Sequence, residues 1–264
     1  MNIGLSGRTA LVTGSTQGIG HAIATRLAQA GAEVVVNGRT AARVDEAVTR
    51  IAADVPDARL RGIAADVADD EGAAGLIAEL PDVDVLVNNL GIFGAVPVLE
   101  IDDAEWRRYF DVNVLAGIRL TRAYLPGMMD RGFGRVLSIS SDSAVVTPVE
   151  MVHYGVTKTA QLAVTRGFAK AAAGTGVTVN SVLAGPTHTE GVEDFVAELV
   201  GDDLPWDEAQ RRFMREHRPQ SLLQRLIEPV EIANMVVYLS SDLASATTGG
   251  AVRVDGGYID SILP

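Results

Sequence analysis

Short apolar runs alternate along the chain with longer segments of helical periodicity. Seven runs rich in Val, Ile and Leu are predicted to be strands, at 9–13, 34–36, 61–64, 83–87, 135–139, 177–182 and 251–254. Several of them are apolar almost throughout, which is typical of strands that helices cover on both faces. Strands and helices in alternation predict right-handed βαβ crossovers and a parallel sheet. We therefore expect a single Rossmann-type α/β domain over 1–264, doubly wound, with a seven-stranded parallel sheet.

The helical segments differ in character. Residues 19–30 place Ile19, Ile23 and Leu27 on one face, as an amphipathic helix does. The segment 187–225 has helix-like spacing, many acidic residues and no clear strand. A structureless loop of this length is uncommon in a compact domain, and this segment also holds several large apolar residues. We expect it to form a helical lid over a substrate site.

Charge and composition exclude several classes of function. The chain has 264 residues, with 22 Lys and Arg against 34 Asp and Glu, and a net charge of −12. Such an acidic chain is poorly suited to nucleic acid or an anionic membrane surface. It has no cysteine, no apolar run of membrane-spanning length and no signal-peptide pattern at its start, and its four histidines lack metal-ligand spacing. We expect a cytoplasmic protein without a metal ion.

A glycine-rich turn follows the first strand and opens the helix at 19–30. It reads Gly14-Ser15-Thr16-Gln17-Gly18-Ile19-Gly20. Gly14 permits a tight turn, Gly18 lets the backbone approach a ligand, and Gly20 lets helix and strand pack closely. The free N–H groups and the dipole of the helix N-terminus favour a phosphate. With a strand before it and a helix after it, the turn predicts a dinucleotide site.

The end of the second strand indicates which dinucleotide binds. The sequence Asn37-Gly38-Arg39 offers no carboxylate to hold the ribose 2′-hydroxyl of NAD(H). Arg39 would instead attract the 2′-phosphate of NADP(H). The alternative is that Arg39 is only a solvated surface residue. We favour NADP(H), with NAD(H) as the second choice.

Tyr154 and Lys158 form a candidate catalytic pair. They lie four positions apart in the helical segment 153–173 and therefore share one face. A phenol titrates near pH 10, and a nearby ammonium lowers that pKa, so Tyr154 could act as general acid or base between a ketone and an alcohol. Ser141, just after the fifth strand, could hydrogen-bond the substrate oxygen. Alone such a pair is usually chance, but beside this serine and the upstream turn it indicates an active site.

Over 13–257 the chain resembles the classical short-chain dehydrogenase/reductase (SDR) family. The matching motifs are Thr13 to Gly20, Asp66-Val67, Asn88-Asn89-Leu90-Gly91, Asn113, the set Ser141, Tyr154 and Lys158, Pro186-Thr187-His188-Thr189, and Val254-Asp255-Gly256-Gly257. Among its members the chain is similar to 3-oxoacyl-thioester reductases and, at 37–39, to gluconate 5-dehydrogenases. Leu90 and Ala184 depart from the family's usual alanine and proline, and neither change removes a catalytic group.

The resemblance implies roles for individual residues. Tyr154 would exchange the proton, Lys158 would hold the nicotinamide ribose, Ser141 would orient the carbonyl, and Asn113 would hold a water in the proton relay. Contacts with the cofactor are implied for Gly14, Ser15, Thr16, Gly18, Ile19, Gly20, Arg39, Asp66, Val67, Asn89, Gly91, Tyr154, Lys158, Thr187 and Thr189. The family also implies a homotetramer that acts on a small carbonyl or alcohol substrate.

We expect Asp142 to serve as a turn or capping residue, His188 to lie at the pocket rim, and Arg218 either to meet an anionic substrate or to lie at the surface. A non-catalytic NADP(H)-binding redox sensor is the alternative function, but it would not need the full catalytic set. Enoyl reductases of this superfamily typically show a wider Tyr–Lys spacing. The acidic net charge disfavours a substrate bound to an acidic carrier protein and favours a small free ketone, sugar acid or secondary metabolite.

Overall fold

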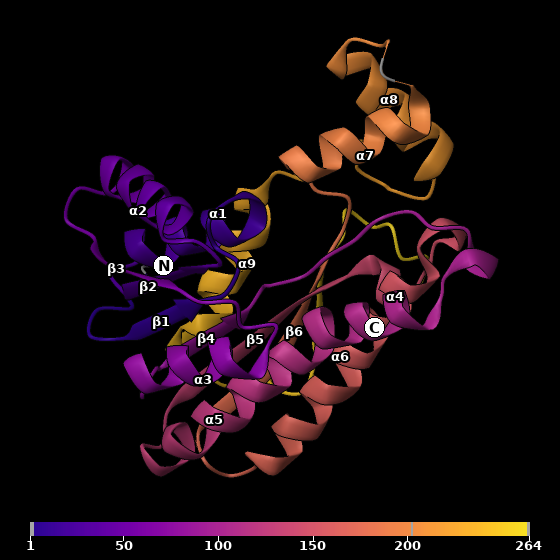
Figure 1. The fold of residues 1–264 in the computed structure, drawn as a ribbon. Helices are drawn as coiled ribbons and strands as arrows, with labels where there is room; N and C mark the ends of the chain where they lie inside the picture. The colour runs from indigo at the N-terminus through magenta and orange to yellow at the C-terminus, as the bar shows by residue number, and fades with distance from the viewer. Residues whose placement is uncertain (1–2, 202, 263–264) are drawn as a thin grey trace.

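All seven expected strands form one parallel sheet (Figure 1). The computed structural model describes residues 3–201 and 203–262. The strands are β1 (Thr9–Val12), β2 (Glu33–Gly38), β3 (Arg59–Ala64), β4 (Val85–Asn88), β5 (Gly134–Ser141), β6 (Val177–Ala184) and β7 (Ala251–Val254). Their order is β3-β2-β1-β4-β5-β6-β7, and each neighbouring pair is parallel. The expected doubly wound α/β fold is confirmed.

Helices cover both faces of the sheet (Figure 1). They are α1 (Gly18–Gln29), α2 (Ala41–Asp54), α3 (Asp70–Glu79), α4 (Asp103–Phe110), α5 (Ala116–Asp130), α6 (Val152–Ala171), α7 (Glu190–Val200), α8 (Trp206–His217) and α9 (Pro229–Ser240). Side chains of α1, α2 and α9 pack on one face, and those of α3, α5 and α6 pack on the other. A wide turn of π-helical type at Asp111–Leu115 joins α4 to α5.

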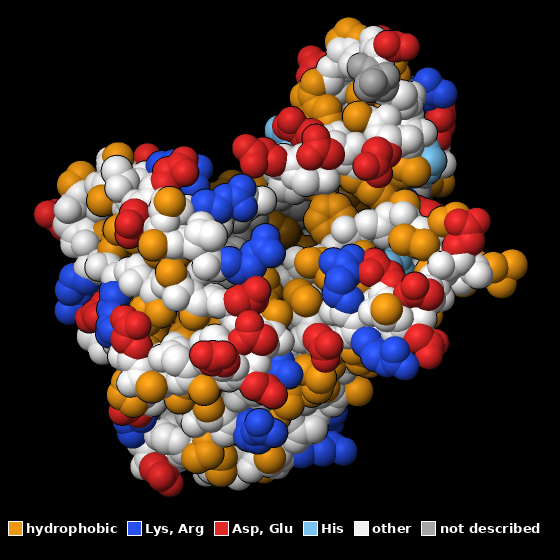
Figure 2. Space-filling view, in the orientation of Figure 1, with side chains coloured by type: hydrophobic (Ala, Val, Ile, Leu, Met, Phe, Trp, Pro, Cys, Tyr) orange, Lys and Arg blue, Asp and Glu red, His pale blue; other side chains and the backbone are white. Residues whose placement is uncertain are grey.

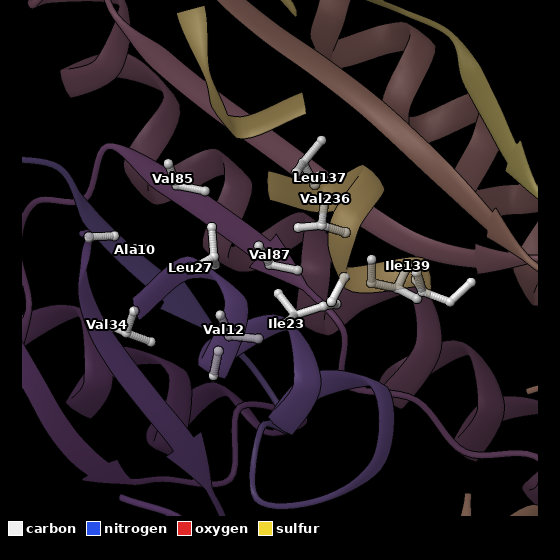
Figure 3. Close-up of a cluster of buried hydrophobic side chains, with 14 of the residues drawn as sticks. Ala10, Val12, Ile23, Leu27, Val34, Val85, Val87, Leu137, Ile139 and Val236 are labelled. Atoms are coloured by element: carbon white, nitrogen blue, oxygen red, sulfur yellow. The ribbon is translucent and has the colours of Figure 1, made fainter. Parts of the chain in front are cut away.

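The two hydrophobic layers explain why the strands are apolar on consecutive positions. Figure 3 shows one layer, in which Val12 and Val87 of the sheet pack with Ile23 and Leu27 of α1. Side chains of the same strands that point the other way, such as Leu11, join the second layer. Burying one such side chain contributes roughly 1.5–3 kcal/mol, so each central strand stabilises the fold on both faces.

The strand order creates a crevice at one edge of the sheet. β1 lies between β2 and β4, so the chain winds in opposite directions from this point. Ligands of open α/β sheets bind at such a reversal, outside the carboxyl ends of the strands. The ends of β1, β4, β5 and β6 deliver the glycine turn, Asn89, Ser141 and Ala184 to this edge.

Two helices form within the segment 187–225, where a helical lid is expected. α7 and α8 project above the sheet edge as a lobe, which we call the α7–α8 lobe (190–217; Figure 1). Its core includes Phe195 and Phe213, and a parallel bridge between Thr187 and Ile227 closes its base.

Candidate active site

A cleft of about 800 Å³ opens at the carboxyl ends of the strands, beneath the α7–α8 lobe. Figure 2 shows the hollow between the lobe and the body of the molecule. Its lining includes the candidates Gly14, Thr16, Gly18, Ile19, Gly20, Asn89, Gly91, Ser141, Tyr154, Lys158, Thr187 and Thr189. The fold therefore gathers most of the predicted site. The lining does not include Ser15, Arg39, Asp66, Val67 or Asn113.

The glycine turn is braced from β4. Gly14 and Gly18 have φ values of +60° and +56°, which favour glycine. A Cβ on Gly20 would collide with the Asn89 side chain and the Gly14 carbonyl. The Asn89 amide donates to the carbonyls of Thr13 and Gly14, at 2.9 and 3.0 Å. Gln17, which caps α1, makes no side-chain bond to the helix N-terminus, so its N–H groups fit a phosphate.

Ser15 has a structural task. Its buried hydroxyl donates to the Val12 carbonyl at 2.7 Å and accepts from the Asn37 N–H at 3.0 Å. These bonds tie the turn to β1 and β2. The contact of Ser15 with the cofactor stays a prediction.

At the end of the cleft beside β2 and α2 the structure places three arginines, of which the sequence analysis identified only Arg39. Arg39 follows β2 directly, is exposed, and makes no side-chain hydrogen bond or ion pair with any residue that the structure describes. Arg43 and Arg50 of α2 line the cleft, together with Glu46. Arg50 donates to the Thr16 carbonyl at 2.6 Å. Arg43 and Arg50 follow Arg39 by about one and three helical turns. This spacing could have indicated that they lie on the same side of α2 as Arg39.

Asp66 and Val67 serve the loop after β3. The Asp66 carboxylate accepts from the Ala68 N–H at 3.1 Å, and Val67 is buried in the second hydrophobic layer. Their contact with adenine stays a prediction.

Tyr154 and Lys158 share the face of α6 that borders the cleft. The Lys158 ammonium lies 5.5 Å from the centre of the Tyr154 ring and donates to the Ile139 carbonyl at 2.8 Å. Burial raises the pKa of the Tyr154 phenol and lowers the pKa of Lys158 to about 8. The expectation that Lys158 lowers the pKa of Tyr154 was therefore wrong for this structure, because burial dominates. The phenol remains protonated at neutral pH, the form of a general acid.

Ser141 and Asp142 form a hydrogen-bonded pair at the end of β5. The Ser141 hydroxyl donates to Asp142 Oδ1 at 2.8 Å and accepts from the Ser143 N–H at 3.1 Å. Asp142 lies in the short helical turn at 142–144, as expected of a turn residue, but Ser141 rather than Asp142 caps that turn. Burial raises the pKa of Asp142 to about 6, and bonds from Ser141 and the charge of Arg218 oppose this only in part.

Asn113 lies in the π-helical turn and is fully engaged by the protein. Its side chain accepts from the Ile92 N–H at 2.8 Å and donates to the Thr157 hydroxyl at 3.0 Å. The Gln161 amide donates to the Asn113 backbone carbonyl at 2.5 Å, a contact that the sequence interpretation missed. A cavity of about 20 Å³ beside Asn113 and Gln161 has room for one water molecule. The role of Asn113 in a proton relay stays a prediction.

The wall under the α7–α8 lobe comes from the loop after β6. Thr187 is buried and donates to the Gly185 carbonyl at 2.8 Å. His188 lies at the rim as expected, 2.7 Å from a Glu193 carboxylate oxygen and stacked on Trp206. A Cβ on Gly185 would collide with the backbone of Asp255.

Arg218 lies inside the molecule and borders the cleft. It is 7% exposed, so the surface role considered for it was wrong. One guanidinium nitrogen, Nη1, lies 3.5 Å from Glu150 and donates to the His217 carbonyl at 2.7 Å. The guanidinium also stands over the Phe213 ring at 5.1 Å.

Comparison with known proteins identifies the family of the chain. A family model described as enoyl-(acyl carrier protein) reductase matches residues 14–259. The uncharacterised oxidoreductase YvaG of Bacillus subtilis is 48% identical over 263 residues, covering 99% of this chain and 100% of YvaG. The 3-oxoacyl-[acyl-carrier-protein] reductase FabG of Aquifex aeolicus is 32% identical over 261 residues, covering 97% of this chain and 99% of FabG. The chain is a short-chain dehydrogenase/reductase.

A solved SDR structure extends the likeness to three dimensions. L-sorbose reductase from Gluconobacter frateurii, complexed with NADPH and L-sorbose, aligns with a TM-score of 0.92 at 32% identity. The alignment covers 99% of this chain and 100% of that one. The chain is therefore an oxidoreductase of this family with a nicotinamide-binding Rossmann fold. The glycine cradle and the uncapped start of α1 are the features of this SDR that fit such a cofactor.

Within 3–201 and 203–262, the structure contains no group of three His, Asp or Glu side chains arranged to hold a metal ion. No helix in that part of the chain is long and apolar enough to cross a membrane.

Proposed function

We propose that this SDR is an NADP(H)-dependent oxidoreductase that interconverts a ketone and a secondary alcohol. The observation that carries the proposal is the position of Ser141, Tyr154 and Lys158 in the same cleft as the glycine turn of α1. A ketone held at Tyr154 would thus lie within reach of a nicotinamide anchored at that turn. When bound, NADPH supplies the hydride for reduction.

Tyr154 acts as the general acid in this proposal. Burial keeps its phenol protonated, so it can donate a proton to the carbonyl oxygen as negative charge develops there. Phe93 contacts the Tyr154 ring edge-on, with 6.3 Å between ring centres, and shields the phenol on one side. Lys158 supplies a buried positive charge beside the ring, held in place by the Ile139 carbonyl. Ser141 positions the substrate oxygen.

The preference for NADP(H) rests on the cationic end of the cleft. A 2′-phosphate carries negative charge, and Arg39 and Arg43 lie four positions apart at the end of β2 and the start of α2. Guanidinium groups bind phosphate through paired hydrogen bonds. The bound NADPH of L-sorbose reductase supports the same choice.

Two alternatives are less well supported. A redox sensor would need only the nucleotide end of the cleft, whereas this cleft continues past Tyr154 to apolar walls that include Phe93 and Phe195. The matching family model carries the name of an enoyl reductase, but the Tyr–Lys spacing of four residues is narrower than that of typical enoyl reductases of the superfamily.

We also propose that the protein is a homotetramer in the cytoplasm. Phe110 and Leu115, at the junction of α4 and α5, are partly exposed and available for a subunit contact. Light scattering would test the assembly, with a mass near four times 27.8 kDa as the expected result.

The proposed reaction is tested by oxidation of NADPH and NADH against a panel of ketones. The panel contains 3-oxoacyl thioesters, keto sugar acids, ketoses and cyclic ketones. Tyr154→Phe is expected to lose turnover by a factor of about 10²–10⁴ and to keep its affinity for NADPH. Tyr238→Phe removes the same hydroxyl from α9 and is the matched control. Equal turnover by Tyr154→Phe, or tight NADPH binding without any turnover across the panel, would contradict the proposal.

A further inference from the structure

Two polar groups at the substrate end of the cleft have unused hydrogen-bonding capacity. Asp142 borders the cleft and is 5% exposed, yet its Oδ2 atom is buried and has no hydrogen-bond partner among the described residues. Arg218 borders the same cleft, and its bonds to Glu150 and His217 use only Nη1. Within the described chain, no acceptor bonds Nε or Nη2 of Arg218. Because buried polar groups are nearly always paired, Asp142 Oδ2 is a candidate for a bond to a ligand, and the free N–H groups of Arg218 are available to donate a second one.

The position of Asp142 relative to Ser141 limits what it can bind. The two residues are consecutive, and Asp142 Oδ1 is 2.8 Å from the Ser141 hydroxyl. The free Oδ2 belongs to the same carboxyl group, on the residue next to the serine that is proposed to position the substrate oxygen. A hydroxyl on the carbon next to the carbonyl is the substrate group best placed to reach it.

The charges around this end of the cleft disfavour an anionic substrate. Glu190 and Glu193 of the α7–α8 lobe line the cleft, and acidic side chains gather on the lower edge of the lobe (Figure 2). Glu150 already pairs with Arg218, the cation at this end. A carboxylate on the substrate would therefore be repelled by these acidic side chains, whereas a neutral hydroxyl would not.

We propose that the substrate is an uncharged ketone bearing a hydroxyl next to its carbonyl, as in a ketose, and that Asp142 is a specificity residue that accepts a hydrogen bond from this hydroxyl. Arg218 donates to a second hydroxyl further along the substrate. This inference rests on the proposed function, because it assumes that the ketone reacts at Tyr154. It narrows the substrate classes left open by the sequence and excludes sugar acids as preferred substrates.

Two further observations support the assignment. An ionised Asp142 can only accept hydrogen bonds, and at pH values above its pKa of about 6 it is ionised. The ionised Asp142 carboxylate can therefore bind a hydroxyl, which donates a hydrogen bond, but not a carbonyl or a second carboxylate, which only accept. The aligned L-sorbose reductase was solved with a ketose, which shows that an SDR of this shape accommodates such a molecule.

The test uses two ketones that differ by one hydroxyl, 1-hydroxy-2-butanone and 2-butanone. At pH 7.5 with NADPH, we expect kcat/KM for the hydroxyketone to exceed that for the plain ketone by about 100-fold or more, because a site built to bind a hydroxyl discriminates against its absence. Asp142→Asn keeps an oxygen for Ser141 but turns the free acceptor into a donor, and should reduce this ratio at least tenfold. Asp103→Asn, at an exposed site on α4, should leave the ratio unchanged.

Arg218 is tested with a longer substrate. Arg218→Gln should lower kcat/KM for a ketohexose relative to 1-hydroxy-2-butanone, and the corresponding keto sugar acid should be reduced more slowly than the ketohexose by the unaltered protein. NADPH affinity, measured by fluorescence, shows whether each variant is folded.

The outcomes separate this inference from the proposed function. Equal kcat/KM for the two matched ketones in the unaltered protein overturns the inference alone, and so does a preference that Asp142→Asn leaves intact. A preference for the sugar acid also overturns it. The matched pair in the unaltered protein decides the question even if Asp142→Asn fails to fold. Absence of any Tyr154-dependent reduction, of either ketone or of any member of the wider panel, overturns the proposed function itself.

Discussion

The Ser141 hydroxyl donates its one proton to Asp142, at 2.8 Å from Oδ1. A single hydroxyl proton cannot serve two acceptors at full strength, so a substrate carbonyl competes with Asp142 for Ser141. Tyr154, whose phenol is kept protonated by burial, is then the donor to the substrate oxygen. Tyr154 thus supplies the proton, and Ser141, oriented by the Asp142 carboxylate, positions the substrate oxygen by sharing its hydrogen bond between the two acceptors.

The buried Asp142 should make stability depend on pH. Burial raises its pKa from the ordinary value to about 6, so in the folded protein the ionised form is the costly one. Between about pH 4 and pH 6 the folded state holds a proton that the unfolded state has lost, and stability declines as pH rises through this window, by on the order of 3 kcal/mol. Asp142→Asn removes this loss. The thermal midpoint of the variant minus that of the unaltered protein should therefore be larger at pH 8 than at pH 4.5.

Thermal unfolding followed by circular dichroism at these two pH values checks this expectation. Asp103→Asn, with its exposed carboxylate, is the control and should show the same difference at both. A difference between Asp142→Asn and the unaltered protein that does not change with pH would show that Asp142 titrates normally.

Reduction should weaken at alkaline pH. Burial lowers the pKa of Lys158 to about 8, so above this pH the side chain loses the positive charge that it holds beside Tyr154. We expect kcat/KM for ketone reduction to fall on the alkaline side with an apparent pKa near 8, since this profile reports groups of the free enzyme. The measurement is initial rate against pH from 6 to 10 at low substrate concentration. A flat profile to pH 10 would refute the assignment to Lys158.

The glycine turn should tolerate no side chain at Gly20. A Cβ there would overlap the Asn89 amide and the Gly14 carbonyl, which brace the turn from β4. Gly20→Ala should therefore weaken NADPH binding at least tenfold, as seen by titration calorimetry, and destabilise the fold. Gly167→Ala is the matched control, because nothing lies within 4 Å of its Cβ position in α6. That helical substitution should stabilise the protein by about 0.5–1 kcal/mol and leave NADPH affinity unchanged.

The parts of the fold that follow from local pattern were predictable. Runs such as 34–36 and 177–182 are apolar because both faces of the sheet are covered, and this requirement is visible in the sequence. The glycine turn was also predictable, because its glycines lead into the first turn of α1. Tyr154 and Lys158 were predictable because a spacing of four places them on one face of α6. These features depend on residues close together in the chain.

Features that depend on burial could not be predicted in this way. For Arg218 the sequence left open a surface position or contact with an anionic substrate, but the structure buries it against Glu150. Asp142 looked like a turn residue, and only the structure shows its unpaired oxygen. The direction of the pKa shift at Tyr154 was predicted wrongly for the same reason. The sequence shows the neighbouring lysine but not the loss of solvent around the phenol.

The choice between NADP(H) and NAD(H) should depend on two arginines rather than one. Arg39 is exposed and makes no bond with the described residues, whereas Arg43 lines the cleft. Arg39→Asp should shift the preference towards NADH, because a carboxylate repels the 2′-phosphate and can accept from the ribose hydroxyl. Arg43→Gln should weaken NADPH binding about tenfold with little effect on NADH, and the double variant should show the largest change in the NADPH/NADH ratio of kcat/KM. Arg107→Gln on α4 is the control, and a ratio that neither cleft variant changes would mean that the 2′-phosphate is recognised elsewhere.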